Sequence, residues 1–576
     1  MKTTSNLTKA GSLGKIYNSA IDALIWKIGP QAHADAYVGD HDGGFAESEF
    51  AGKYLDTCVR LAATDHDPER AAKAFQDAKT VARSIISNQY ADGYIGGMVR
   101  GKEKCAFAVW NQAFTMIGLC SFAAAFPRDP LAEAAKEAAR KIAHYNAKIF
   151  MNDKSILDGG NNGSQHLSLL LGLTRLYKLS PDELTRDFIV HIVGCMESSD
   201  NNFFSFDSIL DLRSKKGIEN FVILIGMLEY GDLFDDLSAL AACEKYWDEL
   251  AETQIRKNGN GTVHEVWTDG GNKPRLVGLD ENPDENCVAV GWIELSLALY
   301  QRKGGKKYID AVERSVFNHL LGALSEDGTD FAYYQPNFGR RITKTIDGYY
   351  QCCRYRGFSA VSLLPLLTFR RAGDTLESML YTGCEYSDDD VKICEKSIYP
   401  YGNRAEIKVE KTGISLKTLR LRTPENAGMS VHIDGQIFTD IQDGYIVLDL
   451  EKLPEKFTVD IDFDIKPVLN LVDIDGKKYA YGEYGCLLLA EEFDCPDCTV
   501  DDGRDAENKK LVTEFYIDIV RNNSKIRLQR DEKLSETDSF ELYRTDFTAG
   551  DKRFTDFASA GREDGKAFTV FVPVAE

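Results

Sequence analysis

The chain has 576 residues, of which 43% are hydrophobic and 27% are charged, the balance of a globular protein with room for more than one hydrophobic core. Its net charge of -22 argues against partners that are polyanions, which means nucleic acid and anionic lipid surfaces. The same charge favours a small ligand that is neutral or weakly charged.

The N-terminal segment MKTTSNLTKAGSLGK lacks the apolar core of a secretory signal. We expect no apolar run that approaches the length of a membrane span, and hence no membrane partner. The 13 cysteines follow no regular spacing, which predicts reduced thiols and a cytoplasmic location. A homodimer is compatible with the sequence, which gives no oligomeric state.

Residues up to about 375 are predicted to be helical. Segments such as EFAGKYLDTCVRLAAT and DPERAAKAFQDAKTVARSIISNQ carry apolar stripes at helical period, and loops with glycine and aspartate separate them. Such helices recur in pairs at a similar spacing. The pattern predicts an N-terminal (α/α)6 toroid over residues 1–378, with loops at one end shaping a pocket.

Two cysteine signatures lie within this helical part, Glu285-Asn286-Cys287 and Cys352-Cys353. Three thiolates and one carboxylate are the number and type of ligands that tetrahedral zinc takes. Adjacent cysteines rarely form a disulfide with each other, because the bond needs more separation than neighbours give. The two signatures therefore predict one Zn²⁺ site.

A helix is predicted to begin near Cys287, because Asn-Pro-Asp-Glu precedes apolar residues at helical spacing. A cysteine at a helix N-terminus has a lowered pKa and is ready to bind a metal or to attack. Residues two apart do not share a helix face, so Glu285 must approach Cys287 from the cap. A closed structural zinc that joins two loops is the alternative, since four protein ligands usually form structural sites.

After about residue 380 the pattern changes to short alternating runs such as FTVDIDFDI. Asp434-Gly435 and Asp475-Gly476 are hairpin signals between such runs. We therefore expect a C-terminal β-sandwich over residues 379–576. Cys495 and Cys498 form a C-x-x-C pair there, which is typical of redox or metal sites, but no second pair lies nearby, and we interpret it as a turn with two free thiols.

Several segments in order resemble one enzyme family. ESEFAGKYL, NQYADGYIGG, the Glu-x-Cys signature, VERSVFNHLLGALSEDGTDFAYYQP and the double cysteine resemble glycoside hydrolase family 127, the zinc-dependent β-L-arabinofuranosidase group. SIYPYGNRAEIKV resembles the opening of that family's sandwich. The likeness covers nearly the whole chain, and the ordered combination of the three central motifs is far more specific than any one of them.

The resemblance implies site residues. The zinc ligands would be Glu285, Cys287, Cys352 and Cys353. Cys352 would be the nucleophile, and Glu265 in GTVHEVW would be the acid/base residue, with Asp269 and Glu281 as its rivals. Glu313 and Tyr333 would contact the sugar. Other interpretations remain open, because Glu313 could pair with Arg314 or Lys307 and Tyr333 could be core packing.

The chain departs from the family pattern at two places near the expected pocket. Arg354-Tyr355-Arg356 follows the double cysteine where the family has Pro-Pro-Asn, and Ile218 stands where the family has a histidine, which leaves Asn220 of that segment. Arg354 and Arg356 could bind a carboxylate-bearing sugar or could pair with acidic groups of the protein itself. Both departures bear on the identity of the sugar.

The resemblance implies a retaining exo-glycosidase that acts on a terminal furanose of a small oligosaccharide or glycoside. Two other functions remain open. The first is a different hydrolase or lyase on the same toroid with a purely structural zinc, and the second is a non-catalytic carbohydrate-binding protein.

Overall fold

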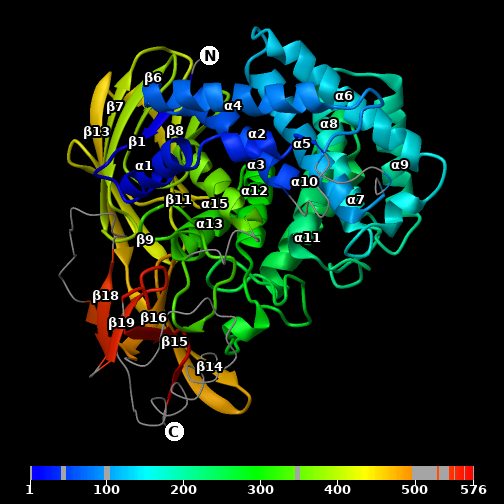
Figure 1. Cartoon of the computed structure of the whole chain (residues 1–576). Helices are drawn as coiled ribbons and strands as arrows, with labels where there is room; N and C mark the ends of the chain where they lie inside the picture. Colours follow the sequence, from blue (N-terminus) through cyan, green and yellow to red (C-terminus); the bar gives the residue numbers. More distant parts are fainter. Residues whose placement is uncertain are drawn as a thin grey trace.

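The computed structural model describes residues 3–39, 47–96, 101, 104–343, 351–495, 529–530, 544–549, 552–563 and 565–574. Helices from the first part of the chain form a ring, and strands from the last part form sheets beside it (Figure 1). This order of helical and β regions is the one that the change of sequence pattern predicts.

Within the described residues, an inner ring of helices closes on itself, because each helix packs on the next and the last packs on the first. These helices are α3 (Glu47–Thr64), α5 (Ala106–Ala125), α8 (Leu169–Leu179), α10 (Gly217–Phe234), α12 (Asn286–Lys303) and α15 (Cys352–Leu363). Helices α5, α10 and α12 are buried over most of their circumference, as expected for helices that are apolar on all sides.

Outer helices pack on the inner ones and carry a buried stripe on one side only. They are α1 (Gly14–Asp22), α4 (Pro68–Asn88), α6 (Leu131–Phe150), α9 (Glu183–Glu197), α11 (Leu237–Thr253) and α13 (Lys306–Arg314). Asp67, Asp182 and Asp236 cap α4, α9 and α11 by accepting backbone N–H bonds. The predicted (α/α)6 toroid is confirmed.

Short helical segments connect the longer helices, and one of them lies among the strands of the C-terminal part. They are η1 (Ala23–Ile28), α2 (Gln31–Asp35), η2 (Ser155–Asp158), α7 (Ser164–Leu167), η3 (Leu279–Glu281), η4 (Ser315–Leu320), α14 (Leu321–Ala323), η5 (Leu364–Leu367) and η6 (Leu450–Lys452). Segment η4 continues α13 directly and so carries the chain from the toroid towards the sheets.

Helix α5 corrects one expectation. It is long and apolar enough to cross a membrane by length and composition, so the expectation that no apolar run approaches a membrane span is wrong. However, 83% of its most apolar window is buried inside the protein, where it packs on α3, α6 and α8. That burial is the environment of a core helix.

The C-terminal part forms a β-sandwich, as predicted. One sheet has the order β1 (Thr4–Leu7), β5 (Cys384–Ser387), β6 (Val391–Ser397), β7 (Arg404–Lys411), β13 (Lys456–Ile465), β9 (Ala427–Ile433) and β10 (Gln436–Phe438). A second has the order β11 (Ile441–Gln442), β12 (Tyr445–Asp449), β8 (Thr418–Arg422), β4 (Thr375–Ser378) and β3 (Phe369–Ala372). Buried and exposed residues alternate along β7 and β13.

A third sheet follows with the order β14 (Pro467–Ile474), β15 (Lys477–Tyr484), β16 (Leu487–Asp494), β19 (Lys552–Asp556), β18 (Asp546–Ala549) and β17 (Gln529–Arg530). Strands β2 (Phe338–Gly339), β20 (Lys566–Thr569) and β21 (Val572–Pro573) pair at its side. Asp434 and Asp475 have φ of 48° and 51° at the turns of the β9–β10 and β14–β15 hairpins, which confirms both predicted turns.

Two strands from the N-terminal part of the chain join sheets of the C-terminal part. β1, near the N-terminus, pairs with β5 of the first sheet, and β2, which follows the toroid's α14, pairs with β20 of the third. Strands also begin at Phe369, before the predicted boundary between residues 378 and 379. That boundary stays a prediction.

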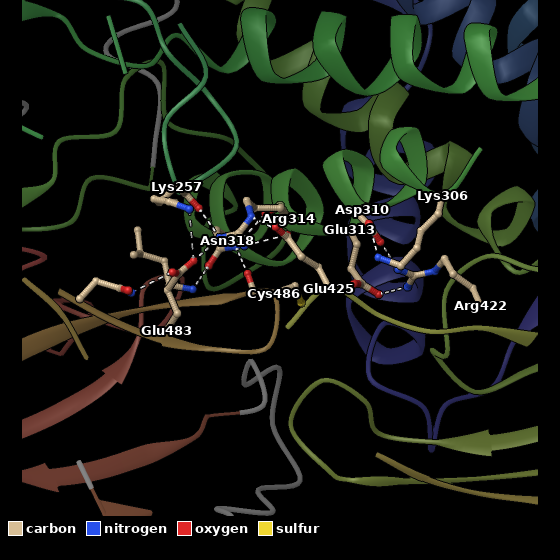
Figure 2. A network of polar contacts seen from close by, with 12 residues as sticks. Lys257, Lys306, Asp310, Glu313, Arg314, Asn318, Arg422, Glu425, Glu483 and Cys486 are labelled. Carbon is tan, nitrogen blue, oxygen red and sulfur yellow. Dashed lines mark hydrogen bonds and ion pairs between the residues drawn. The ribbon is translucent and has the colours of Figure 1, made fainter. Parts of the chain in front are cut away.

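Buried polar contacts join the toroid to the sheets (Figure 2). Arg314, at the end of α13, pairs with Glu425 at 2.8 Å and with Glu483 of β15 at 2.9 Å. The Asn318 amide of η4 donates to the Cys486 carbonyl at 2.9 Å and accepts from the Leu488 N–H at 2.8 Å. These bonds fix α13 and η4 against the sheets.

Candidate active site

The four predicted ligands lie together at one end of the inner ring. Helices α12 and α15 are neighbours in that ring, and both begin at this end. Glu285 caps α12 and Cys287 is in its first turn, while Cys352 and Cys353 begin α15. One donor atom from each of the four residues lies within 4.8 Å of the others. Glu285 therefore approaches from the cap, as the spacing predicts.

This group fits a metal ion. The sulfurs of Cys287 and Cys353 are 3.3 Å apart, and the Asn286 amide donates to the Cys353 carbonyl at 3.0 Å, which ties the two helix starts together. Glu285 Oε2 is buried and makes no hydrogen bond with any residue that the structure describes, although the Lys216 ammonium lies 3.8 Å away. A buried carboxylate oxygen without a hydrogen bond is costly unless a cation satisfies it. Three thiols and one carboxylate suit zinc.

Cys352 differs from the other three members of the group. Glu285, Cys287 and Cys353 are buried, whereas Cys352 is partly exposed. Hydrogen bonds from Cys287 and Cys353 hold the pKa of the Cys352 thiol well below its usual range, against the effect of burial. Burial raises the pKa of Cys287 and of Cys353. The member that a ligand can reach is therefore also the one whose environment favours a thiolate.

Lys53 supplies positive charge beneath the cysteines. It is buried on α3 and forms an ion pair with Glu49 one turn earlier. Burial acts to lower the pKa of Lys53, but Glu49, Cys287 and Cys352 together raise it, so the ammonium stays charged. The sequence could have indicated Lys53, because a Glu and a Lys four residues apart on an apolar helix face can form a buried pair. The spacing alone does not show that the cysteines lie near this lysine.

Glu265 is connected to the same group through two intervening side chains, Tyr334 and Lys216. The Tyr334 hydroxyl donates to Glu265 Oε1, and the Lys216 ammonium pairs with Glu265 Oε2. Lys216 also lies 3.8 Å from Glu285 Oε2, so one ammonium links the predicted acid/base residue to a predicted ligand. The backbone of His264 and Glu265 is left-handed, with φ of 50° and 66°, a strained conformation that clusters at functional sites. Sequence reasoning missed Lys216 and Tyr334.

Tyr333 lies beside Cys352. Its hydroxyl oxygen is 3.2 Å from the Cys352 sulfur, and its carbonyl accepts from the Asn286 N–H at 2.9 Å. Its ring also packs on that of Tyr334, with 4.5 Å between ring centroids. The two tyrosines thus connect Cys352 to Glu265 across one partly exposed face. Contact between Tyr333 and a sugar stays a prediction that this position supports.

Comparison with known proteins identifies the fold around this site. The model of the GH127 catalytic domain of β-L-arabinofuranosidases matches residues 15–364. The chain belongs to glycoside hydrolase family 127. It is thus a glycoside hydrolase, as the sequence motifs imply.

Solved structures agree with this assignment. One is a family 127 β-L-arabinofuranosidase from Geobacillus stearothermophilus T6, with a TM-score of 0.68 and 16% identity over 96% of this chain and 94% of that one. Another is a family 127 β-arabinofuranosidase, with a TM-score of 0.69 and 16% identity over 97% and 92%. A third, described as a glycoside hydrolase, has a TM-score of 0.74 and 13% identity over 100% and 97%. At such identities the likeness shows the fold alone. No curated protein matches the chain.

In this family 127 chain, the described contacts of Glu313 are with residues other than the four predicted ligands. Its side chain is fully buried at the junction with the sheets, where it pairs with Arg422 of β8 and accepts a 3.4 Å bond from the Tyr399 hydroxyl (Figure 2). Neither of the two neighbours predicted from the sequence, Arg314 or Lys307, is its ion-pair partner. Contact with a sugar stays a prediction, and these contacts favour a structural role.

The two arginines after the double cysteine pair within the family 127 chain itself. Arg356 donates two bonds to the Glu294 carboxylate, at 3.0 and 2.8 Å. Arg354 donates to the Thr329 carbonyl at 3.0 Å and lies 3.6 Å from Asp330. The interpretation that pairs these arginines with internal groups is therefore the one that the structure favours.

Two further positions complete the comparison with the sequence. Ile218, at the place of the family histidine, is a buried residue of α10, and Asn220 accepts a 3.1 Å bond from the Trp267 indole. Cys495 is disulfide-bonded, so the expectation of a free thiol there is wrong. Cys498 lies outside the described residues.

Proposed function

We propose that this protein is a retaining exo-glycosidase that releases a terminal furanose of the β-L-arabinofuranoside type, with Cys352 as its nucleophile. The substrate would be a small oligosaccharide or glycoside. The observation that carries the proposal is the position of Cys352. It is the partly exposed member of a group whose other members are buried, and its neighbours lower the pKa of its thiol. A cytoplasmic location stays part of the proposal.

The donor set would hold Zn²⁺ through Glu285, Cys287, Cys352 and Cys353. When bound, the ion would keep the Cys352 thiol ionised at neutral pH and limit its excess charge. The remaining chemistry belongs to the side chains of the chain.

In the first step, the Cys352 thiolate attacks the anomeric carbon as the bond from that carbon to the leaving oxygen breaks. Glu265 gives the leaving oxygen a proton, and a glycosyl thioether remains on Cys352. In the second step, Glu265 takes a proton from a water molecule whose oxygen attacks the anomeric carbon. The carbon–sulfur bond then breaks and the thiolate is restored, so the sugar keeps its configuration.

A screen of aryl glycosides that includes β-L-arabinofuranosides tests the proposal. We expect hydrolysis of a furanoside, with the first product released in retained configuration as seen by proton NMR. Alkylation of thiols should abolish the activity, and a chelator should reduce it. Activity that persists after alkylation of Cys352 would instead support a carboxylate-based hydrolase or lyase with a structural metal, which the compact arrangement of the four donor atoms also allows.

The Glu265→Gln variant should lose about 10²-fold in kcat for a substrate with a poor leaving group, because the leaving oxygen no longer receives a proton. For an activated leaving group such as dinitrophenolate, the loss in kcat/KM should be much smaller. The matched control is Glu281→Gln, which removes a rival carboxylate that pairs with Arg275 at 2.6 Å. A larger loss in the control than in Glu265→Gln would assign the acid/base role elsewhere.

The Lys216→Met variant should lower kcat by about 10- to 100-fold with little change in KM, because the Glu265 carboxylate loses the ammonium that orients it. Lys216→Arg should recover part of the rate, since it restores the charge. Lys215→Met is the matched control, because that side chain is the exposed neighbour of Lys216 and should leave kcat unchanged. Equal losses in the two methionine variants would remove the specific role of Lys216.

A further inference from the structure

A large cavity lies at the other end of the toroid from the cysteines. Its volume is about 830 Å³, within the range of sites for small molecules. All six inner helices line it, mainly with residues from their C-terminal halves, whereas the cysteines stand where α12 and α15 begin. None of the four predicted metal ligands is among the described residues that line it. Lys53, which lies beneath the cysteines and pairs with Glu49, lines the inner end of the cavity, so the cavity opens on the opposite side of Lys53 from the four predicted ligands.

Acidic groups on the cavity wall are already neutralised by arginines. Four pairs line it: Arg60–Asp56 at 2.9 Å, Arg302–Asp232 at 2.5 Å, Arg356–Glu294 at 2.8 Å and Arg175–Glu229 at 3.2 Å. Each of these carboxylates therefore has a guanidinium partner. The charge that remains available to a ligand comes from cations.

Arg175 has two terminal nitrogens that are unused as donors among the described residues. It binds Glu229 through Nε alone, and among the described groups none accepts a bond from its two terminal nitrogens. Its side chain is 32% exposed although α8 belongs to the inner ring, so the exposed part faces the cavity. Lys178 lies one turn further along α8 and lines the same cavity. Both residues therefore present donors to one space.

The rest of the wall is largely apolar. Phe114 and Ile117 of α5, Leu171 of α8, Val222 and Ile225 of α10 and Leu297 of α12 form it. A planar guanidinium with a free edge binds a carboxylate or phosphate group through two parallel bonds. An apolar wall beside it favours a ligand whose body is hydrophobic.

We propose that this cavity is a second ligand site, which binds an organic anion with its carboxylate or phosphate group on Arg175 and Lys178 and its apolar body against α5 and α10. Favourable interaction with the C-terminal carbonyls of α8 accounts for Lys178 in its last turn and for Arg175 just before that turn. It does not account for an apolar cavity in front of their free donors. In a protein of net charge -22, this site is locally opposite in sign to the whole.

Isothermal titration of the full chain with octanoate tests the proposal. We expect octanoate to bind with a Kd below about 1 mM. Acetate, which lacks the body, and octanol, which lacks the charge, should each bind at least about 10-fold more weakly. Octyl phosphate in a parallel titration distinguishes a phosphate ligand from a carboxylate ligand, by whichever binds more tightly.

Arg175→Gln should weaken octanoate binding by about 10- to 100-fold, the usual effect of losing a charge-assisted pair of bonds. The matched control is Arg186→Gln on α9, whose side chain is exposed and paired with Asp187 at 2.8 Å, and which should bind octanoate as the wild type does. Cys352→Ser should also bind normally, which separates this site from the proposed catalytic one.

Ile225→Trp supports the test if Arg175→Gln does not fold, because it fills the apolar side of the cavity without a change in charge. It should abolish octanoate binding. Failure of octanoate to bind the wild type at 10-fold above the expected Kd, or equal binding by wild type and by a folded variant of either kind, would overturn the proposal.

Discussion

Replacing Cys352 with serine should lower kcat/KM for an aryl β-L-arabinofuranoside by at least about 10³-fold, while the protein stays folded. A serine hydroxyl does not ionise near neutral pH, and it is a much weaker nucleophile than a thiolate. In the native protein, hydrogen bonds from neighbouring thiols and from the Tyr333 hydroxyl lower the pKa of the Cys352 thiol, which favours its ionised form. None of these contacts can do the same for an alcohol.

The metal content of the variant distinguishes loss of the nucleophile from loss of the metal site. Glu285, Cys287 and Cys353 are buried and remain in the variant, so the variant should keep most of the zinc that we propose the native protein binds, as measured by mass spectrometry. Cys394→Ser provides the control, because that cysteine is partly exposed on β6 and is outside the four-residue group. It should keep full activity. Substantial turnover by folded Cys352→Ser would exclude the nucleophilic role.

The four predicted ligands could be identified from the sequence because all four belong to two short motifs of metal-binding residue types. Glu285 and Cys287 are two residues apart and Cys352 is next to Cys353, so only two segments had to converge. The fold brings them together because α12 and α15 are neighbouring inner helices that begin at the same end. Periodicity predicts both helices, and ligand type predicts the rest.

Lys216 and Tyr334 could not be found in this way. One precedes α10 and the other lies in a segment after α14, and no spacing in the chain relates either of them to Glu265. Their roles arise only from tertiary contacts. Glu313 shows the converse case, because a family motif implies a sugar contact, which stays a prediction, whereas burial and the pair with Arg422 favour a structural role. A motif therefore predicts which residue type stands at a position better than it predicts which residues that side chain contacts.

Helix α5 shows why composition alone misleads in the same chain. Its residues are apolar enough for a lipid environment, yet in the toroid the same apolar surface is covered by α3, α6 and α8. The sequence pattern specifies that the helix must be buried, but not by what. The neighbours are decided by the closure of the ring, which depends on all the helices together.

Replacing Arg422 with methionine should destabilise the protein by about 3–5 kcal/mol, the range measured when one partner of a buried ion pair is removed. The Arg422 side chain is fully buried on β8 and donates to the Met379 carbonyl at 2.6 Å, to Asp310 at 2.6 Å and to Glu313. Without it, Glu313 is left as a buried charge between the toroid and the sheets (Figure 2).

The pH dependence of this loss has a definite sign. Burial already raises the pKa of Glu313 in the native protein, with Arg422 acting to lower it. In the variant the pKa of Glu313 rises further, so the folded state favours the protonated acid more strongly than the unfolded state does. The variant's free energy of unfolding should therefore fall as the pH rises above the unfolded pKa of glutamate, and the loss should be larger at pH 8 than at pH 5.

Urea unfolding followed by both fluorescence and circular dichroism measures the effect, and coincident transitions are needed for a free energy to be assigned. Arg404→Met is the matched control, because Arg404 is an 81% exposed strand residue paired with Asp462, and its loss should be below about 1 kcal/mol. The double variant with Glu313→Gln should be more stable than Arg422→Met alone, since no charge is left unpaired at position 313. Equal stabilities of the single and double variants would show that Glu313 carries no charge in the fold, and the junction would then be held by Arg314 and by packing.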